Sequence, residues 1–150
     1  MNQNTRSRLA FFVWAIFLFI CYWPCPVGAE EDEVVVIVSK NAPDKDFTKK
    51  MIQQIFVGKL TMWSSNETII VAVLDNDKIH DAFLRKYVHR NPAQFMNTWR
   101  QLMFTGKAKK PKPFSTIEEL IRFVSDNRLA IGYITKNAAD ESVQMIQPSD

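Results

Sequence analysis

The chain has 150 residues, of which 47% are hydrophobic and 23% charged, and its formal net charge is +3. This length and composition are typical of one folded domain that buries a core of its own, and they exclude a disordered chain. The sequence shows no internal repeat and no low-complexity tract.

The first 29 residues have the order of a cleavable export signal. Arg6 and Arg8 precede an apolar run over residues 9–22, and small residues at positions 27–29 favour cleavage after Ala29. The apolar run has 14 residues, whereas a membrane-spanning helix needs about 20. We therefore expect a periplasmic or secreted protein, and the alternative is that this segment is retained as a membrane anchor.

Cleavage after Ala29 changes the chemistry of the working protein. Both cysteines, Cys21 and Cys25, lie in the removed segment, and the bulky residues before each of them disfavour lipid attachment. Residues 30–150 then form a single domain without a thiol for a disulfide, a zinc site or a nucleophile. Loss of two arginines leaves 17 of the 19 basic residues against all 16 acidic ones, so the net charge is +1 and nucleic acid is not expected as a partner.

The first half of the domain predicts the order strand, helix, strand, helix. Residues 34–38 are an unbroken β-branched run, the pattern of a strand covered on both faces. A helix should follow with Asp44 or Asp46 as its N-cap and Gly58 as its terminator. A second apolar strand covers residues 69–74. The apolar faces of the two helices consist of Phe47, Met51, Ile55 and Phe56, and of Ile79, Phe83, Leu84 and Tyr87.

The second half predicts two more helices and two more strands. Asn91 begins a capping box with Pro92 at the first helical position, and this helix should end near Gly106. Residues 105–113, rich in lysine and proline, indicate an exposed connector. Ser115 begins a second capping box. Strands are predicted over residues 129–134 and, more weakly, over residues 143–146.

The predicted elements together indicate an α/β fold. Helices that alternate with strands favour a parallel or mixed sheet with helices on both faces. This arrangement leads us to expect Val36 and Val71 on neighbouring buried strands.

Residues for catalysis, metal binding or a cofactor are missing. His80 and His89 are nine residues apart, so they lack the spacing that places two metal ligands on one helical face, and no serine lies in a glycine elbow. We therefore expect no enzyme, no metal site and no cofactor. A lysine cluster (Lys107, Lys109, Lys110 and Lys112) could attract an anion, an acidic lipid or a partner protein, or it could only be solvated.

Candidate ligand-binding residues follow the first two strands. In α/β sheets, ligands bind outside the carboxyl ends of the strands, where helix N-termini offer free N–H groups. The alternative is that these segments are only loops and helix caps. The two candidate places consist of Ser39, Lys40 and Asn41 after the first strand, and of Asp75, Asn76 and Asp77 after the second.

Two separated motifs resemble the phosphate-type periplasmic substrate-binding proteins of ABC transporters. Residues 55–63 (IFVGKLTMW) are similar to the family's segment in which a helix ends in an aromatic residue followed by glycine, lysine and tryptophan. Residues 130–134 (AIGYI) resemble its closing strand, residues 69–74 its preceding strand, and residues 104–107 (FTGK) its short single-lobe members. The resemblance covers about residues 34–137 and implies one lobe of a type II periplasmic-binding-protein-like fold with a mixed, mostly parallel sheet.

The resemblance also implies a ligand edge, and this chain differs from the family there. Where the phosphate receptors carry arginine and a run of serine, glycine and threonine that holds the anion, residues 74–81 read LDNDKIHD. We expect Asp77 to cap the following helix itself, which leaves few free N–H groups for an anion.

The expected function is that of an exported, non-catalytic binding module for a small anion or polar solute. The alternative is a cell-envelope module that has lost its ligand and contacts a second envelope protein or a transporter.

Overall fold

The computed structural model describes residues 33–150, and all structural statements below concern these residues. The expected signal segment, with Arg6, Cys21, Cys25 and Ala29, lies outside them.

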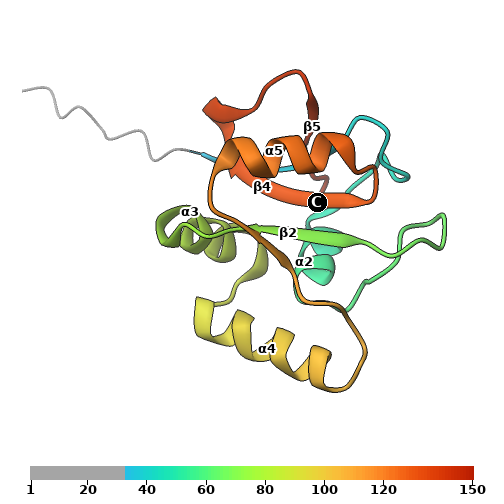
Figure 1. Ribbon diagram of the computed structural model, residues 1–150, viewed down its shortest axis with the longest axis vertical. Coiled ribbons are helices and arrows are strands. Elements are labelled where there is room, and N and C mark those ends of the chain that lie inside the picture. Colours follow the sequence, from blue (N-terminus) through green and yellow to red (C-terminus); the bar gives the residue numbers. More distant parts are fainter. Residues whose placement is uncertain (1–32) are drawn as a thin grey trace, which may run out of the picture. The chain divides into compact units, whose positions relative to one another are not determined.

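The described residues form one sheet with helices on both of its faces (Figure 1). The strands are β1 (Val34–Ser39), β2 (Ile70–Leu74), β3 (Lys112–Phe114), β4 (Ala130–Thr135) and β5 (Val143–Ile146). The helices are α2 (Lys49–Phe56), α3 (Asp77–Phe83), the π-helical turn η1 (Leu84–Val88), α4 (Pro92–Phe104), α5 (Ile117–Asp126) and the short 3-10 turn η2 (Lys136–Ala138).

The sheet has the strand order β3-β2-β4-β1-β5. Strand β2 runs parallel to β3 and β4, whereas β1 runs antiparallel to β4 and β5. Four strands therefore share one direction, which confirms the mixed, mostly parallel sheet. Val36 and Val71 are both buried, but the expectation that their strands are neighbours is wrong, because β4 lies between them. An unbroken apolar run indicates burial on both faces and does not identify the neighbouring strand.

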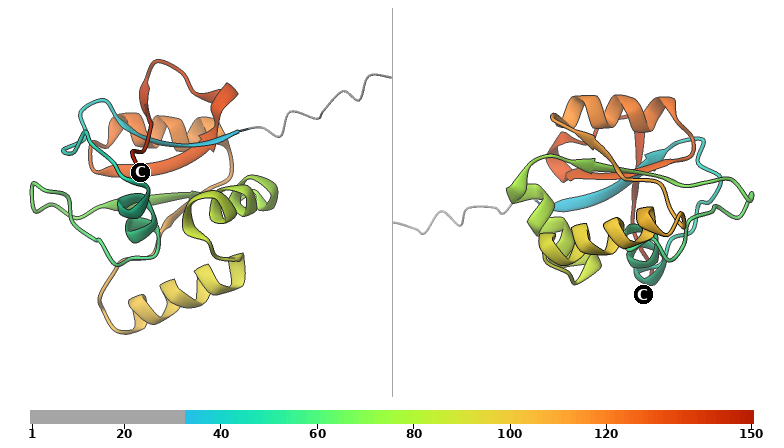
Figure 2. Two further views of the ribbon diagram at one scale, coloured as in Figure 1. Left: turned by 180° about the vertical axis from the view of Figure 1, so that it is seen from behind. Right: turned by 60° about the horizontal axis from the view of Figure 1, so that its bottom comes forward.

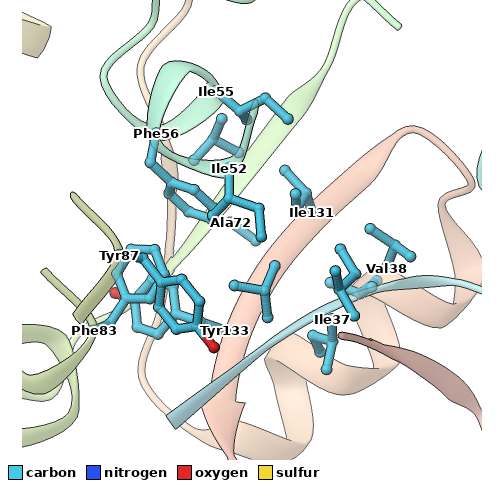
Figure 3. Close-up of a cluster of buried hydrophobic side chains, with 14 of the residues drawn as sticks. Ile37, Val38, Ile52, Ile55, Phe56, Ala72, Phe83, Tyr87, Ile131 and Tyr133 are labelled. Atoms are coloured by element: carbon cyan, nitrogen blue, oxygen red, sulfur yellow. The ribbon is translucent and has the colours of Figure 1, made fainter. Parts of the chain in front are cut away.

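Each face of the sheet is covered by different helices (Figure 2). Helix α5 packs on one face, where a side chain at Gly132 would come within 2.8 Å of Leu120. On the other face, Tyr133 of β4 packs against α2 and α3, and its ring stacks on Phe83 at a centroid distance of 3.9 Å (Figure 3). Because neighbouring residues of a strand point to opposite faces, the pair Gly132-Tyr133 serves both layers.

Helix α4 forms a further layer, beyond α2 and farthest from the sheet in Figure 1. The buried indole N–H of Trp99 donates to the Phe56 carbonyl oxygen at 2.9 Å, which ties α4 to the end of α2. Gly58, at φ +69°, lies so close to α4 that an added Cβ would be 2.3 Å from Leu102. Gly58, which follows the end of α2, therefore also packs against α4.

Helix starts and the shortest strand differ in detail from the sequence expectations. The N-caps of α2 and α5 are Thr48 and Thr116, rather than Asp44 or Asp46 and Ser115, because the threonines hold the extended backbone before each first helical turn. The capping box at Asn91 is confirmed. The last two residues of the expected connector, Lys112 and Pro113, pair with β2 as part of strand β3.

Candidate functional site

The loop after β1 is held by hydrogen bonds of Ser39, the last residue of that strand. Ser39 is only 2% exposed, and its hydroxyl donates to the Ser125 carbonyl oxygen at 3.3 Å and accepts from the Asn41 N–H at 3.3 Å. Lys40 and Asn41 are exposed. Of these three candidates, only Lys40 and Asn41 are therefore accessible to a ligand.

The loop after β2 forms a hydrogen bond with β3 and contains the N-cap of α3. The Asp75 N–H donates to the Phe114 carbonyl oxygen at 2.8 Å, which continues the pairing of β2 with β3. The Asn76 side-chain oxygen accepts from the Ile79 N–H at 3.2 Å, so Asn76 is the N-cap of α3. The expectation that Asp77 caps this helix is wrong, because Asp77 already is its first helical residue.

The two candidate loops lie at opposite ends of the sheet. Because β1 is antiparallel to β4 and β4 is parallel to β2, the carboxyl end of β1 lies at the amino end of β2. Residues 39–41 and residues 75–77 therefore do not meet in one site. The end of the sheet that carries residues 75–77 also holds the carboxyl ends of β3 and β4, and we call it the β2 edge.

The β2 edge is acidic, and its helix starts are capped from within the chain. Asp75, Asn76, Glu118 and Glu119 are exposed there. The Thr116 hydroxyl accepts from the Glu119 N–H at 3.2 Å, as Asn76 does for α3. Side chains of the chain itself thus occupy N–H groups that a bound anion would need.

The buried side chain of Tyr133 forms hydrogen bonds with residues of the β2 edge. The Tyr133 hydroxyl accepts from the Leu74 N–H at 3.1 Å and lies 2.5 Å from Nδ1 of His80. Burial raises the pKa of Tyr133 above its ordinary value, so the hydroxyl keeps its proton. Tyr133 therefore fixes both the end of β2 and the first turns of α3. Sequence reasoning placed Tyr133 in a strand but gave it no role, because only the sheet order brings residues 74 and 133 together.

A groove of about 880 Å³ lies among α2, η1 and the end of β5, with Lys49, Lys50, Lys86 and Lys136 on its walls. Glu33 pairs with Lys86 at 3.3 Å and with Lys136 at 2.9 Å. Hydrogen bonds and charge from these two lysines lower the pKa of Glu33 below its usual range. Lys49 in turn pairs with Asp150. Three of the four lysines thus have an acidic partner within the chain.

Residues 33–150 contain no group of three or more histidine, cysteine, aspartate or glutamate side chains that could hold a metal ion. Within the same residues, no helix has the length and apolar character that crossing a bilayer requires.

Comparison with known proteins agrees with the fold. The family model described as the PBP superfamily domain matches residues 25–145. A protein from Clostridium perfringens, assigned as a phosphate ABC transporter substrate-binding protein and solved with bound phosphate, is 25% identical with a TM-score of 0.61, over 77% of this chain and 44% of its own. No curated protein matches the chain significantly.

Two further solved structures share the fold at lower identity. An ABC-type phosphate transport receptor from Vibrio cholerae is 18% identical with a TM-score of 0.52, over 76% of this chain and 45% of its own. A candidate phosphate-binding protein from Planctomyces limnophilus is 16% identical with a TM-score of 0.55, over 78% of this chain and 41% of its own. The chain thus spans less than half the length of each of these proteins. It belongs to the PBP superfamily, and its described residues correspond to one lobe of such substrate-binding proteins.

Proposed function

We propose that this chain is an exported, non-catalytic binding module whose β2 edge contacts a partner and does not hold free phosphate by itself. The contacts are assigned to Asp75, Asn76 and Asp77. The observation that carries this proposal is the acidic β2 edge, where Asn76 and Thr116 already accept hydrogen bonds from the helix starts.

The charge at the β2 edge opposes an anion. A carboxylate 4 Å from a phosphate charge repels it by about 1 kcal/mol in water and by about 4 kcal/mol in a partly desolvated site. Asp75 places one such group in the loop after β2, and Glu118 and Glu119 lie exposed at the neighbouring helix start. Repulsion of this size would offset the hydrogen bonds that a phosphate could gain there.

A single lobe would also enclose a bound small ligand only in part. Pockets that hold small ligands tightly bury most of the ligand surface, and the matched part of this chain corresponds to 44% of the phosphate-bound relative. A second envelope protein or a transporter subunit could supply the missing wall. In that complex the β2 edge would either contact only the partner or enclose a small anion or polar solute with it. Lys40 and Asn41 offer a separate contact at the other end of the sheet.

Export is proposed from the signal-like order of residues 1–29. Mass spectrometry of the protein from the periplasm or medium should show an N-terminus at Glu30. Recovery of the chain with residues 1–29 still attached would overturn cleavage and favour the retained anchor.

Site-specific photo-crosslinking tests the β2 edge as a contact surface. A photoreactive benzoylphenylalanine replaces Asp75 in one variant and Asp46, an exposed residue outside this edge, in a control. We expect a discrete crosslinked product in cells from position 75 and none from position 46. Equal products from both positions, or none from position 75, would contradict the proposal.

A further inference from the structure

Residues 82–117 carry a net positive charge that is balanced by a net negative charge on the rest of residues 30–150. Residues 82–117 contain eight lysine or arginine residues and no acidic residue, whereas the other residues of 30–150 contain nine basic and sixteen acidic ones. The near-neutral net charge therefore conceals a strongly basic part. This part includes α4, the helix farthest from the sheet, and the loop that follows it (Figure 1).

The end of α4 also exposes an aromatic side chain. Phe104 is 94% exposed, and Met96, two turns earlier on the same helical face, is 45% exposed. Arg100 lies between them in the i, i+4, i+8 series. Arg100, Phe104 and Lys107 also line one hollow of about 710 Å³. Large apolar groups and cations thus occur together on one solvent-facing side of the helix.

The turn after α4 has a defined geometry. Gly106 has φ +68°, its N–H donates to the Met103 carbonyl oxygen at 3.1 Å, and the Lys107 N–H donates to the Leu102 carbonyl oxygen at 2.9 Å. These two bonds form a Schellman motif, which closes the helix end. Phe104 is therefore held in the last turn, directly beside the lysines that follow.

Three of these lysines have no ionic partner among the described residues. The ion pairs found within residues 33–150 involve other cations and leave out Lys107, Lys109 and Lys110, all of which are exposed. Lys112 differs, because its ammonium group lies 4.0 Å from the ring centroid of Phe123. We define the α4 basic surface as Arg100, Phe104, Lys107, Lys109 and Lys110.

We infer that the α4 basic surface binds an anionic lipid bilayer and that Phe104 inserts among the lipids. Clustered lysines are attracted to an anionic membrane surface, and an exposed aromatic ring adds apolar burial, so the two signals together bind where either alone is weak. Helix α4 lies on such a surface in this assignment and does not span it. This inference is independent of the ligand proposed for the β2 edge.

Vesicle sedimentation with residues 30–150 tests the inference, since this stretch contains the whole compact unit Asp32–Asp150 and lacks the apolar run of residues 9–22. We expect binding to vesicles of phosphatidylcholine and phosphatidylglycerol at a ratio of about two to one, and none to phosphatidylcholine alone. Salt at about 0.5 M should release the protein, because it screens exposed charges.

Variants separate the α4 basic surface from general charge. Lys109→Glu/Lys110→Glu should weaken binding to the mixed vesicles by roughly twentyfold or more, and Phe104→Ser should weaken it several-fold. The control Lys50→Glu/Arg122→Glu makes the same change in net charge at exposed positions outside this surface and should bind like the unaltered chain. In Phe104→Trp, brominated lipid should quench the new indole, whereas Trp63 and Trp99 are buried.

Four results would overturn the inference. These are equal binding to both kinds of vesicle, equal loss in the control variant, absence of quenching in bound Phe104→Trp, and binding of free phosphate or of a short DNA duplex by this surface without vesicle binding. The last result would assign the cluster to a soluble anion or to nucleic acid.

Discussion

At the scale of single residues, Tyr133 has the clearest structural task. Its hydroxyl is the acceptor for the N–H of Leu74, the last residue of β2, and it also contacts His80 of α3. A buried N–H that loses its acceptor costs about 1–3 kcal/mol. The geometry of the β2 edge therefore depends on a side chain from the neighbouring strand.

Replacing Tyr133 with phenylalanine should lower the free energy of unfolding by about 1–3 kcal/mol, because the Leu74 N–H would lose its partner. Tyr87→Phe is the matched control, since its hydroxyl makes only a long contact of 3.4 Å with the Val34 carbonyl oxygen. Urea unfolding of both variants measures the difference. Equal losses in the two variants would contradict the role given to Tyr133.

Glu67 contributes a dependence of stability on pH. Hydrogen bonds from Arg128, at 2.5 and 2.7 Å, and from Ser65 lower the pKa of Glu67. A carboxyl group with a lowered pKa in the folded state stabilises the fold above its unfolded pKa of about 4.3, and this contribution is lost as the pH falls through the folded pKa. Glu67→Gln should therefore show a smaller loss of stability between neutral and acidic pH. An unchanged pH profile would exclude this pair as a contributor.

At the scale of elements, two glycines with the same backbone conformation have different surroundings. Gly58 and Gly106 have φ +69° and +68°, but only Gly58 has a neighbour, Leu102, at a distance that a Cβ would violate. Gly106→Ala should cost about 1 kcal/mol for backbone strain. Gly58→Ala should cost about 1–3 kcal/mol more, because the Leu102 side chain of α4 must move away from the added Cβ. Thermal or urea unfolding compares the two, and equal costs would show that α4 is not seated on Gly58.

The element types could be predicted from local patterns, and their arrangement could not. The β-branched run of residues 34–38, the capping box at Asn91 and the apolar face of α5 each identify an element from neighbouring residues alone. The direction of β1, its place beside β4 and the short strand β3 depend on pairing between distant residues. These are contacts that periodicity does not encode.

The same limit applied to the candidate site. The acidic character of residues 75–77 and the position of this loop after a strand were readable in the sequence. That residues 39–41 lie at the opposite end of the sheet follows only from the antiparallel direction of β1. The support from Tyr133 likewise required the strand order, because residues 74 and 133 are 59 positions apart.

At the scale of the whole molecule, charge is separated between two regions. The β2 edge carries Asp75, Glu118 and Glu119, whereas residues 82–117 carry only basic charge. A molecule with such separation can contact an anionic surface and a different partner with different parts of its surface. The net charge of the chain conceals this arrangement.

We expect that this lobe of the PBP superfamily does not hold free phosphate on its own. Calorimetric titration of residues 30–150 with phosphate and with sulfate at physiological salt tests it most directly. We predict no binding in the micromolar range, and a gain of affinity in Asp75→Ser/Asp77→Gly, which removes two acidic residues from the sequence between β2 and α3. Micromolar affinity of the unaltered chain for either anion would contradict this account and identify an ordinary solute receptor.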